Sequence, residues 1–141
     1  MRTFVTTAMK PDAEKSILVV EDEAEAREAL AEFLEAKGYT VDCAENGLEA
    51  LEEIKNKKPR LILLDLMMPL MDGYAFLDQA SKSHLIEDIP VIVTSAYQSR
   101  HAPGAAAVVR KPIRPESLIP VIERLVKRSG DSKTGSAKNA N

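Results

Sequence analysis

The stretch LILLDLMMPLMDGY, residues 61–74, decides the fold class of this chain. It opens with an unbroken apolar run, residues 61–64, which ends at Asp65 and is followed by the turn residues Pro69, Asp72 and Gly73. A short apolar run bounded by turn residues is typical of a strand that is buried on both faces. A buried carboxylate without partners costs roughly several kcal/mol, so we expect Asp65 to find partners elsewhere in the chain.

Similar apolar runs recur on both sides of this stretch and alternate with segments of helical period. The runs predict strands at 16–20, 39–43, 60–65, 89–95 and 105–111, with helices between and after them. Alternating strands and helices with uniformly apolar strands are typical of a parallel sheet that helices cover on both faces. Right-handed crossovers then favour an α/β, doubly wound, flavodoxin-like fold with strand order 2-1-3-4-5.

The connection between the fourth and fifth predicted strands is unusually short. Only nine residues, 96–104, separate Ser95 from Ala105, and they include Pro103 and Gly104. A crossover between parallel strands usually takes a dozen or more residues and contains a helix. We therefore expect the fourth helix of the fold to be short or missing.

The regular pattern extends over residues 16–128, which we interpret as a single domain. Residues 1–15 and 129–141 lack an apolar period and predict a flexible N-terminal tail and a disordered C-terminal tail. The segment after residue 128 is too short and too polar to fold by itself. We therefore expect a domain that stands alone, without an effector domain behind it.

The composition excludes several classes of function. A net charge of −3 gives no general attraction to nucleic acid or anionic membranes, and no apolar run reaches the roughly 18 residues of a membrane span. Cys43 is the single cysteine, so an internal disulfide is impossible; with only two separate histidines beside it, a zinc site is not expected. The N-terminus lacks the apolar core of a signal peptide, and we expect a cytoplasmic protein.

Polar side chains follow four of the predicted strands, at the point where each strand ends: Glu21 and Asp22, Asp65, Thr94 and Ser95, and Lys111. The carboxyl ends of parallel strands meet at one edge of a sheet, where doubly wound folds bind their ligands. Each group also has a plainer interpretation: Asp22 as a helix cap, Glu21 as a first-turn charge, Asp65 as a loop residue just beyond a strand, Ser95 as a cap and Lys111 as a solvated lysine. A shared site accounts for all of them at once, so we expect them to converge.

Three carboxylates at one site repel each other, which favours a divalent cation between them. Mg²⁺ prefers oxygen ligands and typically binds one or two carboxylates beside a phosphate. With this cation present, Asp65 can act as a nucleophile toward phosphorus and form an aspartyl phosphate. Lys111 would then pair with the transferred group, and the Ser95 hydroxyl would donate a hydrogen bond to one of its oxygens.

Four segments resemble, in this order, the receiver domain of two-component response regulators: ILVVEDE at 17–23, LILLDLMMPLMDG at 61–73, IPVIVTSA at 89–96 and RKP at 110–112. The resemblance implies that Asp65 is the phosphoacceptor, which takes its phosphoryl group from a histidine kinase or a histidine phosphotransfer protein. It also implies that Mg²⁺ is bound directly by Asp22 and Asp65, through water by Glu21, and by the backbone carbonyl of Met67. Ser95 and Lys111 then stand where receivers carry the hydroxyl and the lysine that contact the phosphoryl group.

Two features depart from the receiver pattern. The connection 96–104 is shorter than in most receivers, and Val108 stands where many receivers carry an aromatic switch residue. Both departures put the usual output surface in doubt, but not the site. Met67 and Tyr97 occupy two positions where receivers vary and thereby tune dephosphorylation; Tyr97 would shield the phosphate from water or only cover the fourth strand.

The resemblance implies a phosphorylation-gated switch rather than an enzyme, which acts on a downstream protein target or passes its phosphoryl group on. It leaves the oligomeric state open. One alternative is a receiver fold with a vestigial site that serves only as an interaction module. Another is an aspartyl-phosphate hydrolase of the haloacid dehalogenase type, which needs an acid two residues after the nucleophile, where this chain has Met67.

Overall fold

The computed structural model describes residues 15–68, 70–96 and 104–139, with side chains up to residue 127. Every strand lies within two residues of the range predicted for it. In chain order the elements are β1 (Ser16–Val20), α2 (Ala24–Ala36), β2 (Thr40–Ala44), α3 (Gly47–Asn56), β3 (Leu61–Asp65), α4 (Gly73–Lys82), β4 (Val91–Ser95), β5 (Ala107–Arg110) and α5 (Pro115–Asn139).

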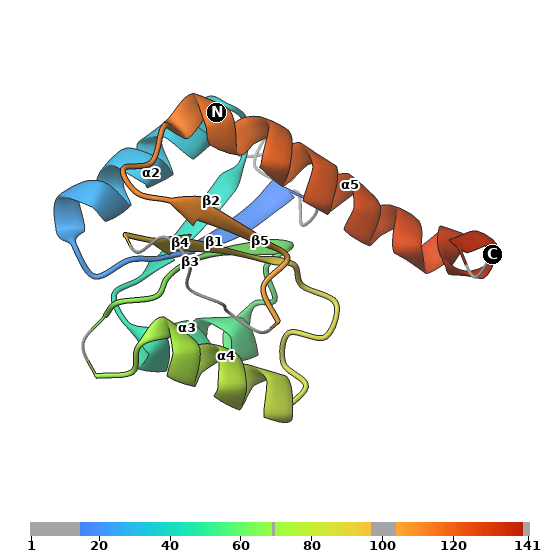
Figure 1. Cartoon of the computed structure of the whole chain (residues 1–141), viewed down its shortest axis with the longest axis horizontal. Coiled ribbons are helices and arrows are strands. Elements are labelled where there is room, and N and C mark those ends of the chain that lie inside the picture. Colours follow the sequence, from blue (N-terminus) through green and yellow to red (C-terminus); the bar gives the residue numbers. More distant parts are fainter. Residues whose placement is uncertain (1–14, 69, 97–103, 140–141) are drawn as a thin grey trace, which may run out of the picture.

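The strands form one five-stranded parallel sheet in the order β2-β1-β3-β4-β5. Helices α2 and α5 lie on one face of this sheet, and α3 and α4 lie on the other (Figure 1). Each pair of helices encloses its own hydrophobic core against the sheet. The doubly wound, flavodoxin-like fold that the sequence predicts is thus confirmed.

The three central strands, β1, β3 and β4, are buried at every position. Neighbouring strands and helices on both faces cover them, so their side chains alternate between the two cores. In β1, Leu18 and Val20 pack toward α3 and α4, whereas Ile17 and Val19 pack toward α2 and α5. The edge strand β5 differs, since half-buried and exposed residues alternate along it.

Two helices begin with a side-chain cap at the carboxyl edge of the sheet. Asn46 Oδ1 accepts the N–H of Glu49 at 2.9 Å, and Asp72 Oδ1 accepts the N–H of Ala75 at the same distance. The spacing of Asn46 and Glu49, three residues apart, is typical of a capping box, but the Glu49 carboxylate accepts the N–H of Glu45 and not that of Asn46. The two caps therefore fix the ends of the turns that precede α3 and α4 at this edge.

Between β4 and β5 the structure describes residues 96 and 104–106, which contain no helix. Residues 97–103, which include Tyr97, lie outside the described part of the chain. Ala107 and Val109 of β5 pack toward α2 and α5, so Val108 faces the opposite side. There its side chain is 51% exposed, which leaves this part of the sheet face open to solvent.

The last helix extends past residue 128, where the regular apolar pattern of the sequence ends. Helix α5 runs over Pro115–Asn139 and projects past the sheet (Figure 1). It therefore continues over most of the segment that the sequence marks as a disordered tail. That segment contains no proline, and its glycines, Gly130 and Gly135, cost about 1 kcal/mol each without forbidding a helix. Neither α5 nor any other described helix is apolar enough over a sufficient length to cross a membrane.

Candidate functional site

Residues from distant segments meet at the carboxyl edge of the sheet. Val20 of β1 pairs with Leu64 of β3, so Glu21, the next residue, follows level with Asp65. On its other side β3 pairs with β4, and β4 pairs with β5, whose last residue directly precedes Lys111. The strand order thus brings together four groups that the sequence holds up to 90 positions apart.

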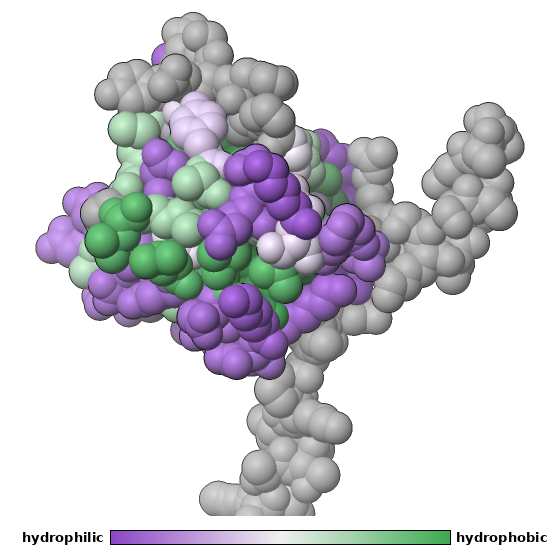
Figure 2. Space-filling model, turned by 90° about the horizontal axis from the view of Figure 1, so that it is seen from below, coloured by the Kyte–Doolittle hydropathy of each residue, from purple (hydrophilic) through white to green (hydrophobic). Residues whose placement is uncertain are grey.

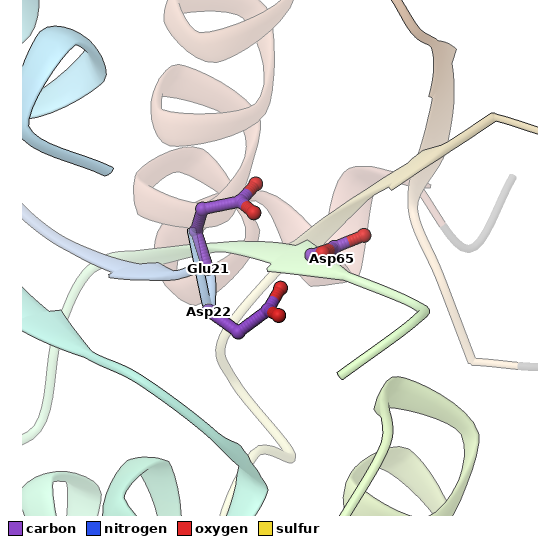
Figure 3. Close-up of side chains that lie close together, drawn as sticks. All are labelled: Glu21, Asp22 and Asp65. Atoms are coloured by element: carbon purple, nitrogen blue, oxygen red, sulfur yellow. The ribbon is translucent and has the colours of Figure 1, made fainter. Parts of the chain in front are cut away.

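Three carboxylates lie close together at this edge. Figure 3 shows Glu21 and Asp22, which follow β1, beside Asp65 at the end of β3. One oxygen from each of them lies within 4.8 Å of the other two. Glu21 and Asp65 are each only 3% exposed, whereas Asp22 is exposed and opens the group to solvent. Such a set of oxygen donors can hold a hard divalent cation.

Lys111 pairs with both buried carboxylates. Its Nζ lies 3.3 Å from Asp65 Oδ1 and 3.4 Å from Glu21 Oε1. The residue stands directly after β5, ahead of a cis peptide bond to Pro112. The interpretation of Lys111 as a solvated lysine is therefore wrong.

The site carries more negative charge than one lysine compensates. Burial raises the pKa of Asp65, although Lys111 and the N–H of Met67 lower it in part. Burial also raises the pKa of Glu21, and the charge of Asp65 adds to this effect. Burial lowers the pKa of Lys111, but its pairing with Asp65 and Glu21 outweighs burial and raises that pKa above its usual value. A divalent cation would favour the ionised form of both carboxyls.

Close packing of the backbone explains why the turn after Asp65 ends in a glycine, Gly73. A Cβ atom at this position would lie 2.7 Å from the carbonyl oxygen of Asp65 and from the Cα atom of Leu66. The N–H of Gly73 donates a hydrogen bond of 2.9 Å to the carbonyl oxygen of Leu66. Only a residue without a side chain lets the start of α4 pack this closely against the backbone that carries Asp65.

The turn after β1 has a different structure from the one that a helix cap would produce. The N-cap of α2 is Glu23, so the interpretation of Asp22 as a helix cap is wrong. Glu21 Oε2 accepts the N–H of Glu23 at 3.2 Å, and Arg27 Nη1 donates to the carbonyl oxygen of Glu21 at 3.0 Å. Arg27 was not predicted from the sequence. The available signal was a basic residue one helical turn after the acidic pair.

The other candidate site residues, Ser95, Met67 and Thr94, lie at or just after the carboxyl ends of β3 and β4. Ser95 is the last residue of β4 and is buried, and its carbonyl oxygen accepts the N–H of Lys111 at 2.8 Å. The N–H of Met67 donates to Asp65 Oδ1 at 3.3 Å, while its side chain is exposed. Thr94 is buried beside them in β4. Tyr97 lies outside the described residues, so its expected role stays a prediction.

Comparison with known proteins identifies the family. Residues 17–123 match the family described as the response regulator receiver domain. The chain belongs to this family. It is 34% identical over 137 residues to the response regulator Rre1 of Synechocystis sp., a match that covers 87% of this chain and 58% of Rre1. This receiver chain thus spans less than two thirds of the length of that relative.

Solved receiver structures have the same fold. A CheY-like response regulator receiver domain protein from Methanospirillum hungatei JF-1 superposes with a TM-score of 0.77 at 29% identity, covering 84% of this receiver and 98% of that chain. The response regulator TrrA of Thermotoga maritima, whose structure is a complex with Mg²⁺-BeF, has a TM-score of 0.71 at 33% identity, covering 79% and 98%. The acidic group of this receiver is consistent with the Mg²⁺ site typical of the family.

Membership of the receiver family assigns the chain to two-component signal transduction, in which a histidine kinase is the implied partner. A receiver is a signalling module rather than a classical enzyme. The hydrolase alternative loses its support, because Met67 stands where such enzymes need their second acid.

Proposed function

We propose that this receiver is a phosphorylation-gated switch in which Asp65 accepts a phosphoryl group in the presence of Mg²⁺. The observation that carries the proposal is the meeting of three carboxylates within 4.8 Å, two of them paired with Lys111. In an ordinary surface patch of acidic residues, all the carboxylates would be solvated. Here Glu21 and Asp65 are buried, and their ionisation costs free energy unless a cation is near.

The donor set fits Mg²⁺ by its chemistry, since all of its members offer oxygen atoms. Asp22 and Asp65 would bind the ion directly, Glu21 would bind it through a water molecule, and Met67 would contribute its carbonyl oxygen. When bound, the ion neutralises negative charge on the carboxylates and on an incoming phosphoryl group. The structure of TrrA, which is 33% identical to this chain, is a complex with Mg²⁺-BeF, and this supports Mg²⁺ as the cation of the site.

Phosphoryl transfer to Asp65 then needs little more than positioning. A carboxylate oxygen of Asp65 forms a bond to phosphorus while the phosphorus–nitrogen bond of a phosphohistidine breaks, and the electron pair of that bond stays on the imidazole. Lys111, which pairs with Asp65 before transfer, would bind an oxygen of the transferred group. Ser95, at the end of the neighbouring strand, would donate its hydroxyl hydrogen to another oxygen.

The surface beside the site supports a protein as the phosphodonor. Met67 and Leu70, in the turn after Asp65, and Leu48, at the start of α3, are exposed large apolar residues. Apolar side chains gather at one side of the face that carries α3 and α4 (Figure 2). Because Asp65 is buried, a donor must approach closely enough to cover this turn. We infer that apolar side chains flank the phosphohistidine of the histidine kinase or phosphotransfer protein, which would meet this receiver in the cytoplasm.

Incubation with Mg²⁺ and acetyl phosphate tests the proposal. Intact-mass and peptide analysis should find one phosphoryl group, located on Asp65, and none in the D65N variant. The matched control is D78N on α4, which removes an exposed carboxylate and should leave the modification unchanged. A wild-type chain that stays unmodified points to a vestigial site, and a chain that consumes acetyl phosphate in many turnovers points to a hydrolase; either result overturns the proposal.

A further inference from the structure

A guanidinium group lies beneath the turn that carries two of the three carboxylates. Arg27, in the first turn of α2, donates from Nη1 to the carbonyl oxygen of Glu21 at 3.0 Å, and the carbonyl oxygen of Asp22 lies 3.5 Å from the same nitrogen. Its side chain is 14% exposed. The second nitrogen, Nη2, lies 4.0 Å from Glu45 Oε2 in the turn after β2. Arg27 therefore links the backbone of both acidic residues to α2 and to a neighbouring turn.

Besides Arg27, backbone and side-chain groups of Glu21 hold this turn, and the N–H of Glu21 donates to the carbonyl oxygen of Ala44 at 3.0 Å. The N-cap residue of α2, Glu23, makes no side-chain cap hydrogen bond. Its N–H is accepted by Glu21 Oε2, while Glu21 Oε1 lies near Lys111. Glu21 thus divides its two oxygens between the turn and the site, and a cation that attracts this carboxylate would compete with the turn for it.

We propose that Arg27 is a positioning residue for the metal site of this receiver, an inference that rests on the proposed function. Arg27 holds the main chain of Glu21 and Asp22 and uses no side-chain oxygen of the site. The two carboxylates therefore stay aimed at Asp65 when the cation draws Glu21 away from the N–H of Glu23. A fixed backbone reduces the conformational freedom that these ligands lose on binding, and this raises metal affinity. The planar guanidinium suits the role because it presents several donors in one fork, whereas a lysine offers a single point of attachment.

Calorimetric titration of the metal-free full chain with Mg²⁺ tests the proposal without relying on phosphorylation. R27M keeps much of the apolar stem and removes all donors, R27K keeps the charge without the fork, and R124M on the exposed side of α5 is the matched control. We expect the Kd for Mg²⁺ to rise about tenfold in R27M, which corresponds to about 1.4 kcal/mol. R27K should lie between R27M and wild type, and R124M should bind as wild type does.

A second measurement separates positioning from general support of the fold. At saturating Mg²⁺ the R27M variant should be phosphorylated by acetyl phosphate to the wild-type extent, because the missing hydrogen bonds affect how the ligands are held and not the transfer itself. A Kd in R27M equal to that of R124M overturns the proposal, even if the melting temperature of R27M is lower. If R27M does not fold, R27K decides: a weaker Kd supports the role of the fork and an unchanged Kd overturns it. A wild-type chain that binds no Mg²⁺ overturns the proposed metal site and this inference together.

Discussion

Replacing Asp65 by asparagine should stabilise the metal-free receiver at pH 7. The folded protein holds this carboxyl at 3% exposure and raises its pKa, chiefly because burial disfavours the ionised form. Ionised Asp65 therefore costs free energy in the folded state that it does not cost in the unfolded chain. Asparagine has nearly the same shape, keeps an oxygen that can accept the N–H of Met67, and carries no charge.

The magnitude follows from effects that partly cancel. At an effective dielectric constant of about 20, the Glu21 charge, which lies within 4.8 Å, costs roughly 3.5 kcal/mol or more, and the Lys111 charge at 3.3 Å returns roughly 5 kcal/mol. Repulsion from Asp22 is weaker because that side chain is exposed and screened by solvent. The charge pairs therefore nearly balance, and the desolvation of a buried carboxylate decides the sign. We expect D65N to raise the free energy of unfolding by about 2 kcal/mol.

Urea unfolding followed by circular dichroism, with EDTA present, measures this difference. The matched control, D78N, loses an exposed carboxylate 3.2 Å from Lys82 and should stay within about 0.5 kcal/mol of wild type. Because the pKa of Asp65 is raised above its ordinary value of 3.8, the penalty is absent below that pH and grows as the pH rises through the folded value. The advantage of D65N should therefore shrink on acidification toward pH 4. A D65N variant no more stable than wild type at pH 7, or one that gains further in acid, would refute the reasoning.

Mg²⁺ should reverse this difference, because it should raise the free energy of unfolding of the wild type more than that of D65N. A ligand that binds only the folded state adds about 2.7 kcal/mol at a concentration of 100 times its Kd. The wild type should gain this amount, whereas D65N has lost one of the expected ligands. Equal stabilisation of both proteins by Mg²⁺ would show that Asp65 does not contribute to the metal site.

Three further predictions concern residues around the same edge. K111M should still accept the phosphoryl group on Asp65 but should lose the amide chemical-shift changes that accompany phosphorylation, because the cation 3.3 Å from Asp65 is gone; an unaltered NMR response would make the lysine a bystander. G73A should lower the free energy of unfolding by about 1–3 kcal/mol in urea, since its methyl group would lie 2.7 Å from the carbonyl oxygen of Asp65; wild-type stability would contradict the close approach. N46A should cost about 1 kcal/mol with an unchanged slope of the urea transition, because α3 loses the acceptor for the Glu49 N–H; a midpoint equal to that of wild type would count against the cap.

Parts of the site could be predicted because they depend on strand ends. Glu21, Asp65 and Lys111 each follow or end a short apolar run, and parallel strands put such positions at one edge whatever the details of packing. The Asn46 cap was also within reach, since capping is a local interaction between residues three apart. The end of α5 was not, because the polar segment after residue 128 carries no apolar period by which a sequence marks a helix.

The sequence by itself determined the order of the elements, the parallel sheet and the edge at which the acidic residues gather. The apolar period can be read from the sequence, and crossover handedness follows a general rule, so neither requires knowledge of a specific contact. Only the tertiary structure decided that Lys111 lies between Glu21 and Asp65, that Arg27 holds the acidic turn and that Gly73 touches the backbone of Asp65. Such contacts depend on strand register and side-chain rotamers to within about an ångström, and those quantities are set by packing among residues that the sequence keeps far apart.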